Sequence, residues 1–236
     1  MPIPIIAHRT CPLDAPENSL AGIRKAAELG ADGVEIDVRR ALFGAPVLMH
    51  DWSPWRTTGL PGPVGLYPYF LLSHARLQQE TERVPSLDEA LAALPDGLFL
   101  AMELKESSVA ATALRLVQRR GLEPRVLVWS SREQAIRYVK KQAPEIETAL
   151  LRDETDPASL SLMLDDALRF GARAISAHWS AITRQLVGEA HDRGLRVYSM
   201  TQDLDTVAKR VACGLDGIVT DHPREVRALL EATAAS

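Results

Sequence analysis

Short apolar runs alternate with longer amphipathic segments from one end of the chain to the other. Eight of the runs are apolar almost throughout and rich in β-branched residues, which is typical of strands buried on both faces of a parallel sheet. We expect strands over Ile3–His8, Gly33–Val38, Phe99–Leu104, Arg125–Ser130, Glu147–Leu151, Arg173–Ala177, Leu195–Met200 and Gly217–Thr220. The intervening segments have helical spacing, and we expect helices over Glu17–Leu29, Ser86–Leu94, Val109–Arg120, Arg132–Lys141, Ser159–Phe170, Ala181–Arg193, Leu204–Cys213 and Pro223–Ala232.

Eight strand–helix units with short connections predict a closed (β/α)8 barrel, the TIM-barrel fold of the α/β class. The length of 236 residues suits one such barrel, so we expect a single domain over residues 1–236. An open, doubly wound sheet is the alternative. That fold usually has a glycine-rich turn after its first strand, whereas the turn here reads His-Arg-Thr-Cys-Pro. The barrel is therefore the favoured prediction.

One apolar run, Pro46–His50, does not fit the alternation of strands and helices. It follows Val38 by only about eight residues, which is too few for a crossover to a parallel neighbour. A turn at Phe43–Pro46 can instead fold it back as a hairpin arm. Such an arm would return His50 to the rim of the barrel at which the preceding strand ends.

The following stretch, Asp51–Val84, fits no barrel element, so we expect an insertion over about residues 39–84. It contains five prolines or glycines between Gly59 and Gly65. It also holds five of the chain's twelve aromatic residues: Trp52, Trp55, Tyr67, Tyr69 and Phe70. A long insertion after a barrel strand lies at the catalytic face and is commonly a lid or a specificity element. The alternative is an insertion that merely packs its rings against the barrel.

Charge and apolar content disfavour nucleic acids and membrane insertion. The net charge of −4 and the scattered Lys and Arg residues provide no basic surface for a nucleic acid. No window approaches ~20 apolar residues, so we expect no stable membrane insertion. The first residues carry no secretory signal, and the two cysteines, Cys11 and Cys213, are too few for a disulfide framework. We expect a cytoplasmic protein, whose oligomeric state the sequence leaves open.

Carboxylates gather where the strands of the predicted barrel end. Glu35 and Asp37 are two apart on one strand and so share a face, and Glu103 ends the next strand. Three converging carboxylates repel one another unless a cation compensates them. Oxygen ligands alone favour Mg²⁺ or Ca²⁺, so we predict a divalent-cation site. The alternative is that Arg9, Lys105 and Arg39 neutralise these carboxylates.

Two histidines are expected at the same rim. His8 ends the first strand and His50 ends the hairpin arm, and a histidine pair can supply one base and one acid near neutral pH. Cleavage of a P–O bond needs both. Arg9 and Lys105 add the fixed positive charge that phosphate oxygens require. A single histidine would more often be a satisfied core residue, but two beside a carboxylate cluster favour a phosphodiesterase.

The motifs around these residues resemble those of the glycerophosphodiester phosphodiesterases along essentially the whole chain. They read Ala7-His8-Arg9, Ala15-Pro16-Glu17-Asn18-Ser19, Gly33-Val34-Glu35-Ile36-Asp37-Val38, Pro46-Val47-Leu48-Met49-His50-Asp51, Arg56-Thr57-Thr58-Gly59, Val84-Pro85-Ser86-Leu87-Asp88-Glu89, Glu103-Leu104-Lys105 and Gly217-Ile218-Val219-Thr220-Asp221-His222-Pro223. Each motif alone is weak, whereas eight of them in order are a strong signal.

The resemblance implies a metal-dependent barrel enzyme that cleaves glycerophosphodiesters to glycerol 3-phosphate and an alcohol. By motif position, it implies acid–base roles for His8 and His50, and a Ca²⁺ or Mg²⁺ site made by Glu35, Asp37 and Glu103. It further implies phosphate binding by Arg9 and Lys105, with Asn18 as a polar residue in contact with the ligands.

The chain departs from the family pattern at three places. Thr10 stands where the family usually has glycine, and Ala41-Leu42-Phe43-Gly44 replaces a Thr-x-Asp-Gly turn. Met200-Thr201-Gln202-Asp203 replaces Trp-Thr-x-Asn, which removes a stacking tryptophan from the side expected to recognise glycerol. The catalytic set is complete, while the substrate-recognition set is altered.

Three rival functions remain open. The aromatic insertion suits a lipid diester, as in relatives resembling lysophospholipase D or sphingomyelinase D. Metal-assisted enolisation with Lys105 as the base also uses carboxylates on successive strands, but it has no need of His8 and Arg9 on the first strand. A barrel retained only to bind a phosphodiester is the third.

Overall fold

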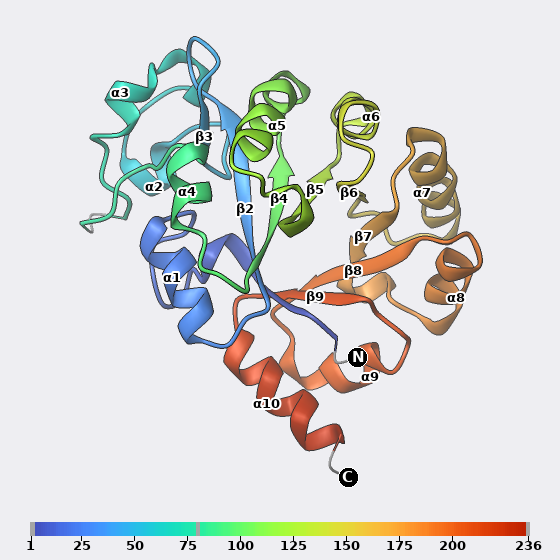
Figure 1. Ribbon diagram of the computed structural model, residues 1–236. Helices are drawn as coiled ribbons and strands as arrows, with labels where there is room; N and C mark the ends of the chain where they lie inside the picture. The colour runs from blue at the N-terminus through green and yellow to red at the C-terminus, as the bar shows by residue number, and fades with distance from the viewer. Residues whose placement is uncertain (1–2, 79–80, 235–236) are drawn as a thin grey trace.

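The computed structural model describes residues 3–78 and 81–234, and eight parallel strands in it form a closed barrel (Figure 1). The strands are β1 (Ile5–Ala7), β2 (Gly33–Arg40), β4 (Phe99–Leu104), β5 (Val126–Ser130), β6 (Glu147–Leu151), β7 (Ala174–His178), β8 (Arg196–Thr201) and β9 (Gly217–Thr220). Neighbours in this series pair in parallel, and β1 closes the ring because it pairs with both β2 and β9. The predicted (β/α)8 barrel is confirmed.

Helices cover the outside of the barrel (Figure 1). They are α1 (Leu20–Glu28), α4 (Leu87–Ala93), α5 (Ala110–Arg119), α6 (Glu133–Gln142), α7 (Pro157–Phe170), α8 (Arg184–Asp192), α9 (Val207–Val211) and α10 (Pro223–Ala234). Short 3-10 turns are η1 (His8–Thr10), η2 (Val64–Leu66), η3 (Ser107–Val109), η4 (Glu123–Arg125), η5 (Trp179–Ala181) and η6 (Leu204–Thr206). None of the helices in the described ranges has the length and apolar character needed to cross a bilayer.

Capping side chains set where the helices begin. The hydroxyl of Ser19 accepts a hydrogen bond from the Gly22 amide, so α1 begins at Leu20 and not at Glu17 as the sequence suggested. Ser86 and Glu89 form a capping box at the start of α4, each side chain bonding the other residue's backbone amide. These caps leave Glu17 and Asn18 outside the helix, in the loop that faces the barrel rim.

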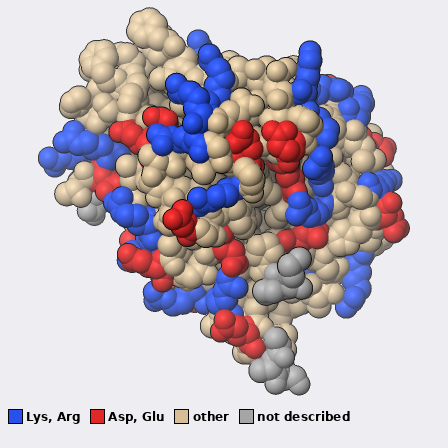
Figure 2. All heavy atoms as spheres, in the orientation of Figure 1, with Lys and Arg blue, Asp and Glu red and all other residues tan. Residues whose placement is uncertain are grey.

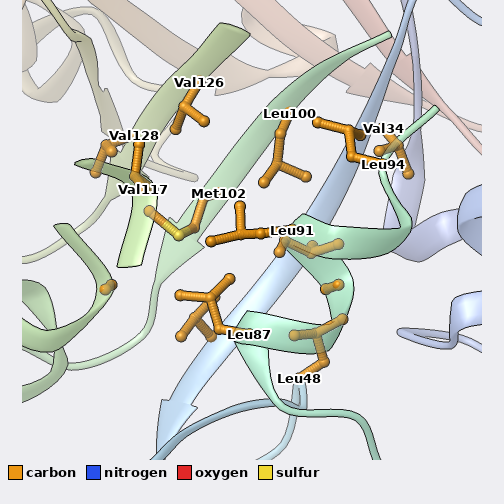
Figure 3. Packing of buried hydrophobic residues seen from close by; sticks show 14 of the residues in the cluster. Val34, Leu48, Leu87, Leu91, Leu94, Leu100, Met102, Val117, Val126 and Val128 are labelled. Atoms are coloured by element: carbon orange, nitrogen blue, oxygen red, sulfur yellow. The ribbon is translucent and has the colours of Figure 1, made fainter. Parts of the chain in front are cut away.

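Two apolar layers hold the barrel together. The outer layer lies between strands and helices, and Figure 3 shows a part of it in which α4 packs on the sheet. The labelled side chains there include Leu87, Leu91, Leu94, Val34, Leu100 and Met102. The inner layer fills the barrel itself, where the rings of Trp129 and Tyr198 lie with centroids 5.4 Å apart. Because this interior is filled with side chains, the space for a ligand lies at the end of the barrel.

The chain between β2 and α4 forms a separate structure beside the barrel. β3 (Pro46–Leu48) pairs antiparallel with β2, and α2 (Trp55–Thr58) and α3 (Tyr69–Leu72) follow. This segment has its own small core of Ala41, Val47, Met49, Val64, Leu72, Leu77 and Val84. Its aromatic residues do not all pack inward, since Trp52, Trp55 and Phe70 are exposed. These three rings are therefore not buried against the barrel, and the role of the insertion as a lid or specificity element stays a prediction.

Candidate active site

A cavity of about 970 Å³ opens at the end of the barrel where the parallel strands finish. Seven of the eight site residues expected from the sequence line it: His8, Arg9, Glu35, Asp37, His50, Glu103 and Lys105. The eighth, Asn18, is buried behind Asp37: its amide donates to Asp37 Oδ2 over 2.7 Å, and its carbonyl accepts from the Asp37 amide over 2.9 Å. The predicted residues therefore gather at one site.

The three predicted carboxylates converge at this cavity. Asp37 and Glu103 are direct partners across β2 and β4, and Glu35 lies two residues before Asp37 on the same face. One oxygen from each of the three lies within 4.8 Å of the others. Burial, and then the negative charges of Asp37 and Glu103, raise the pKa of Glu35 well above its usual range. Burial and the neighbouring carboxylates therefore disfavour the ionised form of Glu35.

Lys105 partly neutralises this cluster, which bears out a part of the alternative to a cation site. Its Nζ lies 2.8 Å from Asp37 Oδ1 and 2.7 Å from Glu103 Oε1. Arg9 is farther away, with Nε 3.7 Å from Asp37 Oδ2. Arg39 takes no part, because it bonds Glu106 and the His50 carbonyl. Two cations thus face three carboxylates.

The donor set still fits a divalent cation. Within the described chain, Glu35 Oε1 and Glu103 Oε2 accept no hydrogen bond, and the other Glu35 oxygen accepts only the Arg9 amide, over 2.8 Å. A hard cation prefers such carboxylate oxygens and would offset the burial and the repulsion that raise the pKa of Glu35. The cluster is therefore suited to a divalent cation in the presence of Lys105.

His8 is fixed by an aspartate from the opposite end of the chain. It follows β1 directly, and its Nδ1 lies 2.7 Å from Oδ1 of Asp221, which follows β9. Gln202, beyond β8, donates to the second oxygen of Asp221. Burial raises the pKa of Asp221, but the bonds from His8 and Gln202 more than offset this, and the pKa lies below its ordinary value. Because ionised Asp221 holds Nδ1 of His8, the other ring nitrogen, Nε2, faces away from Asp221.

His50 is held in a similar way by its neighbour in sequence. Its Nδ1 lies 2.7 Å from Asp51 Oδ1, and the other Asp51 oxygen accepts from Arg56 over 2.6 Å. Arg56 in turn makes a two-pronged ion pair with Glu17 at 2.6 and 2.8 Å. Burial acts to raise the pKa of Asp51, but the bonds from Arg56 and His50 lower it to about 2. Each candidate histidine therefore has a carboxylate on Nδ1.

The backbone at the end of β1 is bent so that its amide can reach the carboxylate cluster. Arg9, Thr10 and Cys11 have φ of 41°, 64° and 67°, values that are rare outside glycine. Thr10, which stands where the resemblance expects glycine, adopts this conformation in spite of its branched side chain. Its Oγ1 accepts from the Ser19 amide over 3.2 Å, and Gly22 gives it room, since a Cβ at Gly22 would lie 2.1 Å from Thr10 O. The Arg9 amide thereby reaches Glu35.

Three residues that support the site were not singled out from the sequence: Asp221, Asp51 and Gln202. Asp221 directly follows the barrel strand β9, so the rule that places site residues at strand ends could have located it also. Asp51 and Gln202 stand within quoted motifs but gave no signal of their own. Met200, at a departure from the family pattern, lines the cavity beside Gln202.

Comparison with known proteins agrees with this geometry. Residues 8–225 match the model of the glycerophosphoryl diester phosphodiesterase family. A glycerophosphodiester phosphodiesterase of Caldanaerobacter subterraneus is 30% identical over 93% of this chain and 94% of its own length. A phosphodiesterase of Oleispira antarctica, solved with the product sn-glycerol-3-phosphate, superposes with a TM-score of 0.88 at 26% identity, with 97% of each chain covered.

A second solved structure supports the fold alone, because its sequence is more distant. It is a glycerophosphoryl diester phosphodiesterase homologue from Silicibacter pomeroyi, with a TM-score of 0.87, 24% identity, and 98% of this chain and 94% of its own covered. The family match over nearly the whole chain identifies the relationship. The chain belongs to the glycerophosphoryl diester phosphodiesterase family, a family of phosphoric diester hydrolases.

Proposed function

We propose that the protein hydrolyses glycerophosphodiesters to glycerol 3-phosphate and an alcohol, with a divalent cation and two histidines. The observation that carries this proposal is that His8 and His50 line the same cavity as the Glu35, Asp37 and Glu103 cluster. Family membership supports the reaction class, and the Oleispira antarctica relative was solved with sn-glycerol-3-phosphate.

Glu35, Asp37 and Glu103 would hold the cation. When bound, Mg²⁺ or Ca²⁺ supplies positive charge for a phosphate oxygen and lowers the pKa of a nearby hydroxyl. Asn18 keeps Asp37 in place through its two hydrogen bonds, so the ligand oxygens need little rearrangement.

His8 and His50 would transfer the protons. With Nδ1 of each ring turned to Asp221 or Asp51, Nε2 is the nitrogen left to face the substrate. One imidazole takes the proton of the attacking oxygen, and the other gives a proton to the departing alcohol oxygen as the P–O bond breaks. The attacking oxygen is either a glycerol hydroxyl, which gives a cyclic phosphate that water then opens, or water itself.

Arg9 and Lys105 would bind the phosphate. The ammonium group of Lys105 has three protons, of which two point to Asp37 and Glu103, so one remains for a phosphate oxygen. Arg9 Nε has no hydrogen-bond partner in the described chain although it is buried. A phosphate oxygen within reach of the Arg9 side chain would compensate that group.

The proposal is tested by the release of glycerol 3-phosphate from glycerophosphocholine. Chelator-treated protein should be inactive, and Mg²⁺ or Ca²⁺ should restore turnover. His8→Ala and His50→Ala should each lower the rate at least ~100-fold, as loss of a general acid or base typically does. His191→Ala is the matched control, because His191 also pairs with an aspartate but does not line the cavity. Near-wild-type activity in both His8→Ala and His50→Ala would refute the mechanism.

A further inference from the structure

The insertion carries most of the exposed large apolar side chains of the described chain. Of eleven such residues, six lie in residues 43–71, and we call these six the apolar rim. They are Phe43, Trp52, Trp55, Leu66, Phe70 and Leu71. Figure 2 shows tan spheres at the upper left, over α3, with Lys or Arg side chains beside them at the hairpin of β2 and β3. Exposed apolar residues scattered singly are ordinary, whereas a gathered set of this kind marks an interaction surface.

Packing within the chain does not account for these residues. Among its described residues, the buried core of the insertion contains no aromatic ring, whereas Phe43, Trp52, Trp55 and Phe70 lie exposed outside it. Phe43 is the clearest case, because it is 87% exposed and has a φ of 64°, where turns ordinarily carry glycine or asparagine. Neither the exposure nor the backbone conformation favours phenylalanine in the isolated protein. A role in contact with another apolar phase would account for it.

The apolar rim is joined through the backbone to the cavity, because Trp52 lies two residues after His50, which lines it. Trp52 follows Asp51, which bonds His50, and the carbonyl of Trp52 accepts from the Val64 amide over 2.9 Å. The hairpin tip is joined to the same structure by a bond from the Leu42 amide to the Tyr67 carbonyl, also 2.9 Å. These backbone bonds hold the hairpin, the loop after His50 and the start of α3 together. The rim is therefore fixed relative to the candidate catalytic residues.

The charge of the insertion differs from that of the whole chain. Residues 39–84 contain five arginines and three acidic residues, a net charge of +2, although the net charge of the chain is −4. Arg40 and Arg76 are exposed, and neither makes an ion pair with a described residue. Aromatic side chains with arginines around them suit a lipid surface with anionic head groups, where tryptophan lies at the interface and cations meet phosphate or carboxylate.

We propose that the apolar rim docks the protein onto an anionic lipid surface, with the mouth of the cavity turned to the bilayer. Phosphodiesters whose alcohol part carries an acyl chain would then reach His50 directly from the lipid phase. This second statement, on the substrate, rests on the hydrolysis proposed above, whereas the docking does not. A protein partner or a second copy of this chain is the competing occupant of the rim.

Cosedimentation with lipid vesicles tests the docking. The wild-type chain should sediment with vesicles of phosphatidylcholine and phosphatidylserine, and less with phosphatidylcholine alone. The triple variant Phe43→Asn, Trp52→Ser, Phe70→Ser should lose at least ~10-fold of the partition coefficient, because three largely exposed rings no longer enter the apolar phase. The control Leu162→Ser, Leu168→Ser removes two exposed apolar side chains from α7 and should bind like wild type.

Two activity measurements separate the failure of docking from the failure of the proposed function. Hydrolysis of the water-soluble diester bis(p-nitrophenyl) phosphate should be equal in wild type and the triple variant, whereas hydrolysis of vesicle-bound lysophosphatidylcholine should fall with vesicle binding. Wild type that does not sediment, or a triple variant that sediments like wild type, overturns the docking whatever the activity. If the wild type is a dimer that does not bind vesicles, and the triple variant is a monomer, the apolar rim is a contact between two copies of the chain. This result also overturns the docking.

Discussion

Replacement of Asp221 by alanine should lower the turnover of a glycerophosphodiester without unfolding the protein. Asp221 comes from the end of β9 and fixes His8, which comes from the end of β1, through a bond of 2.7 Å. The bond is largely shielded from water, since only 17% of the His8 side chain and 6% of the Asp221 side chain are exposed. Without it the ring is free to turn, and no carboxylate stabilises its protonated form.

The size of the effect follows from the kind of bond that is removed. A hydrogen bond to a charged group contributes about 1.5–3 kcal/mol. If the bond stabilises only the transition state in which His8 transfers a proton, its removal should reduce kcat/KM about 10- to 150-fold, with most of the change in kcat. Asp221→Asn should recover part of the loss, since its amide oxygen can still accept from the ring.

The assay is the initial rate of glycerol 3-phosphate release at saturating and limiting glycerophosphocholine, for the single variants and for the double variant with His8→Ala. If Asp221 acts through His8, Asp221→Ala should have no further effect in the His8→Ala background. Asp216→Ala is the control, because Asp216 makes a similar 2.8 Å bond to His191 outside the cavity. Equal losses from Asp221→Ala with and without His8 would refute the reasoning.

Three further outcomes are expected. The affinity for Mg²⁺ or Ca²⁺ should rise with pH until the raised pKa of Glu35 is passed, because Glu35 must lose its proton before the cation binds. Calorimetric titrations over about pH 5 to 8 measure this affinity, and a constant affinity contradicts the prediction. Lys105→Met should destabilise the metal-free protein by about 3 kcal/mol, because Asp37 and Glu103 lose their nearest cation, and Ca²⁺ should restore part of the lost melting temperature. An unchanged melting temperature would count against the pairing. Burial, with the charge of a nearby aspartate, raises the pKa of Cys11 to about 12. A thiol reagent should therefore label Cys213 in the native protein and Cys11 only after unfolding. Prompt labelling of both cysteines would show the prediction to be wrong.

The sequence predicts the barrel well because its signals are local. Each strand is a continuous apolar run, and each of the eight expected strands corresponds to one of the observed barrel strands. The carboxylate cluster could also be predicted, since side chains two apart on a strand share a face and neighbouring parallel strands end at one rim. Asp37 and Glu103 are indeed partners across β2 and β4.

Other features depend on distances that no local pattern encodes. His8 and Asp221 are 213 residues apart in the sequence and meet only because β1 and β9 close the ring. The sequence offers Arg9, Lys105 and Arg39 as equal candidates for pairing with the carboxylates, yet Lys105 makes the close contacts and Arg39 turns to Glu106. An aromatic residue of the insertion, such as Trp52 or Phe70, is equally compatible with packing and with exposure until its neighbours are known.

A crystal structure grown with Ca²⁺ and glycerol 3-phosphate tests the central claim most directly. The proposed function predicts one Ca²⁺ bound by Glu35, Asp37 and Glu103 at about 2.3–2.6 Å, with a phosphate oxygen beside it and Nε2 of His8 and of His50 facing the phosphate. A cluster still neutralised by Lys105 alone, with no ion among the three carboxylates at saturating Ca²⁺, would contradict it.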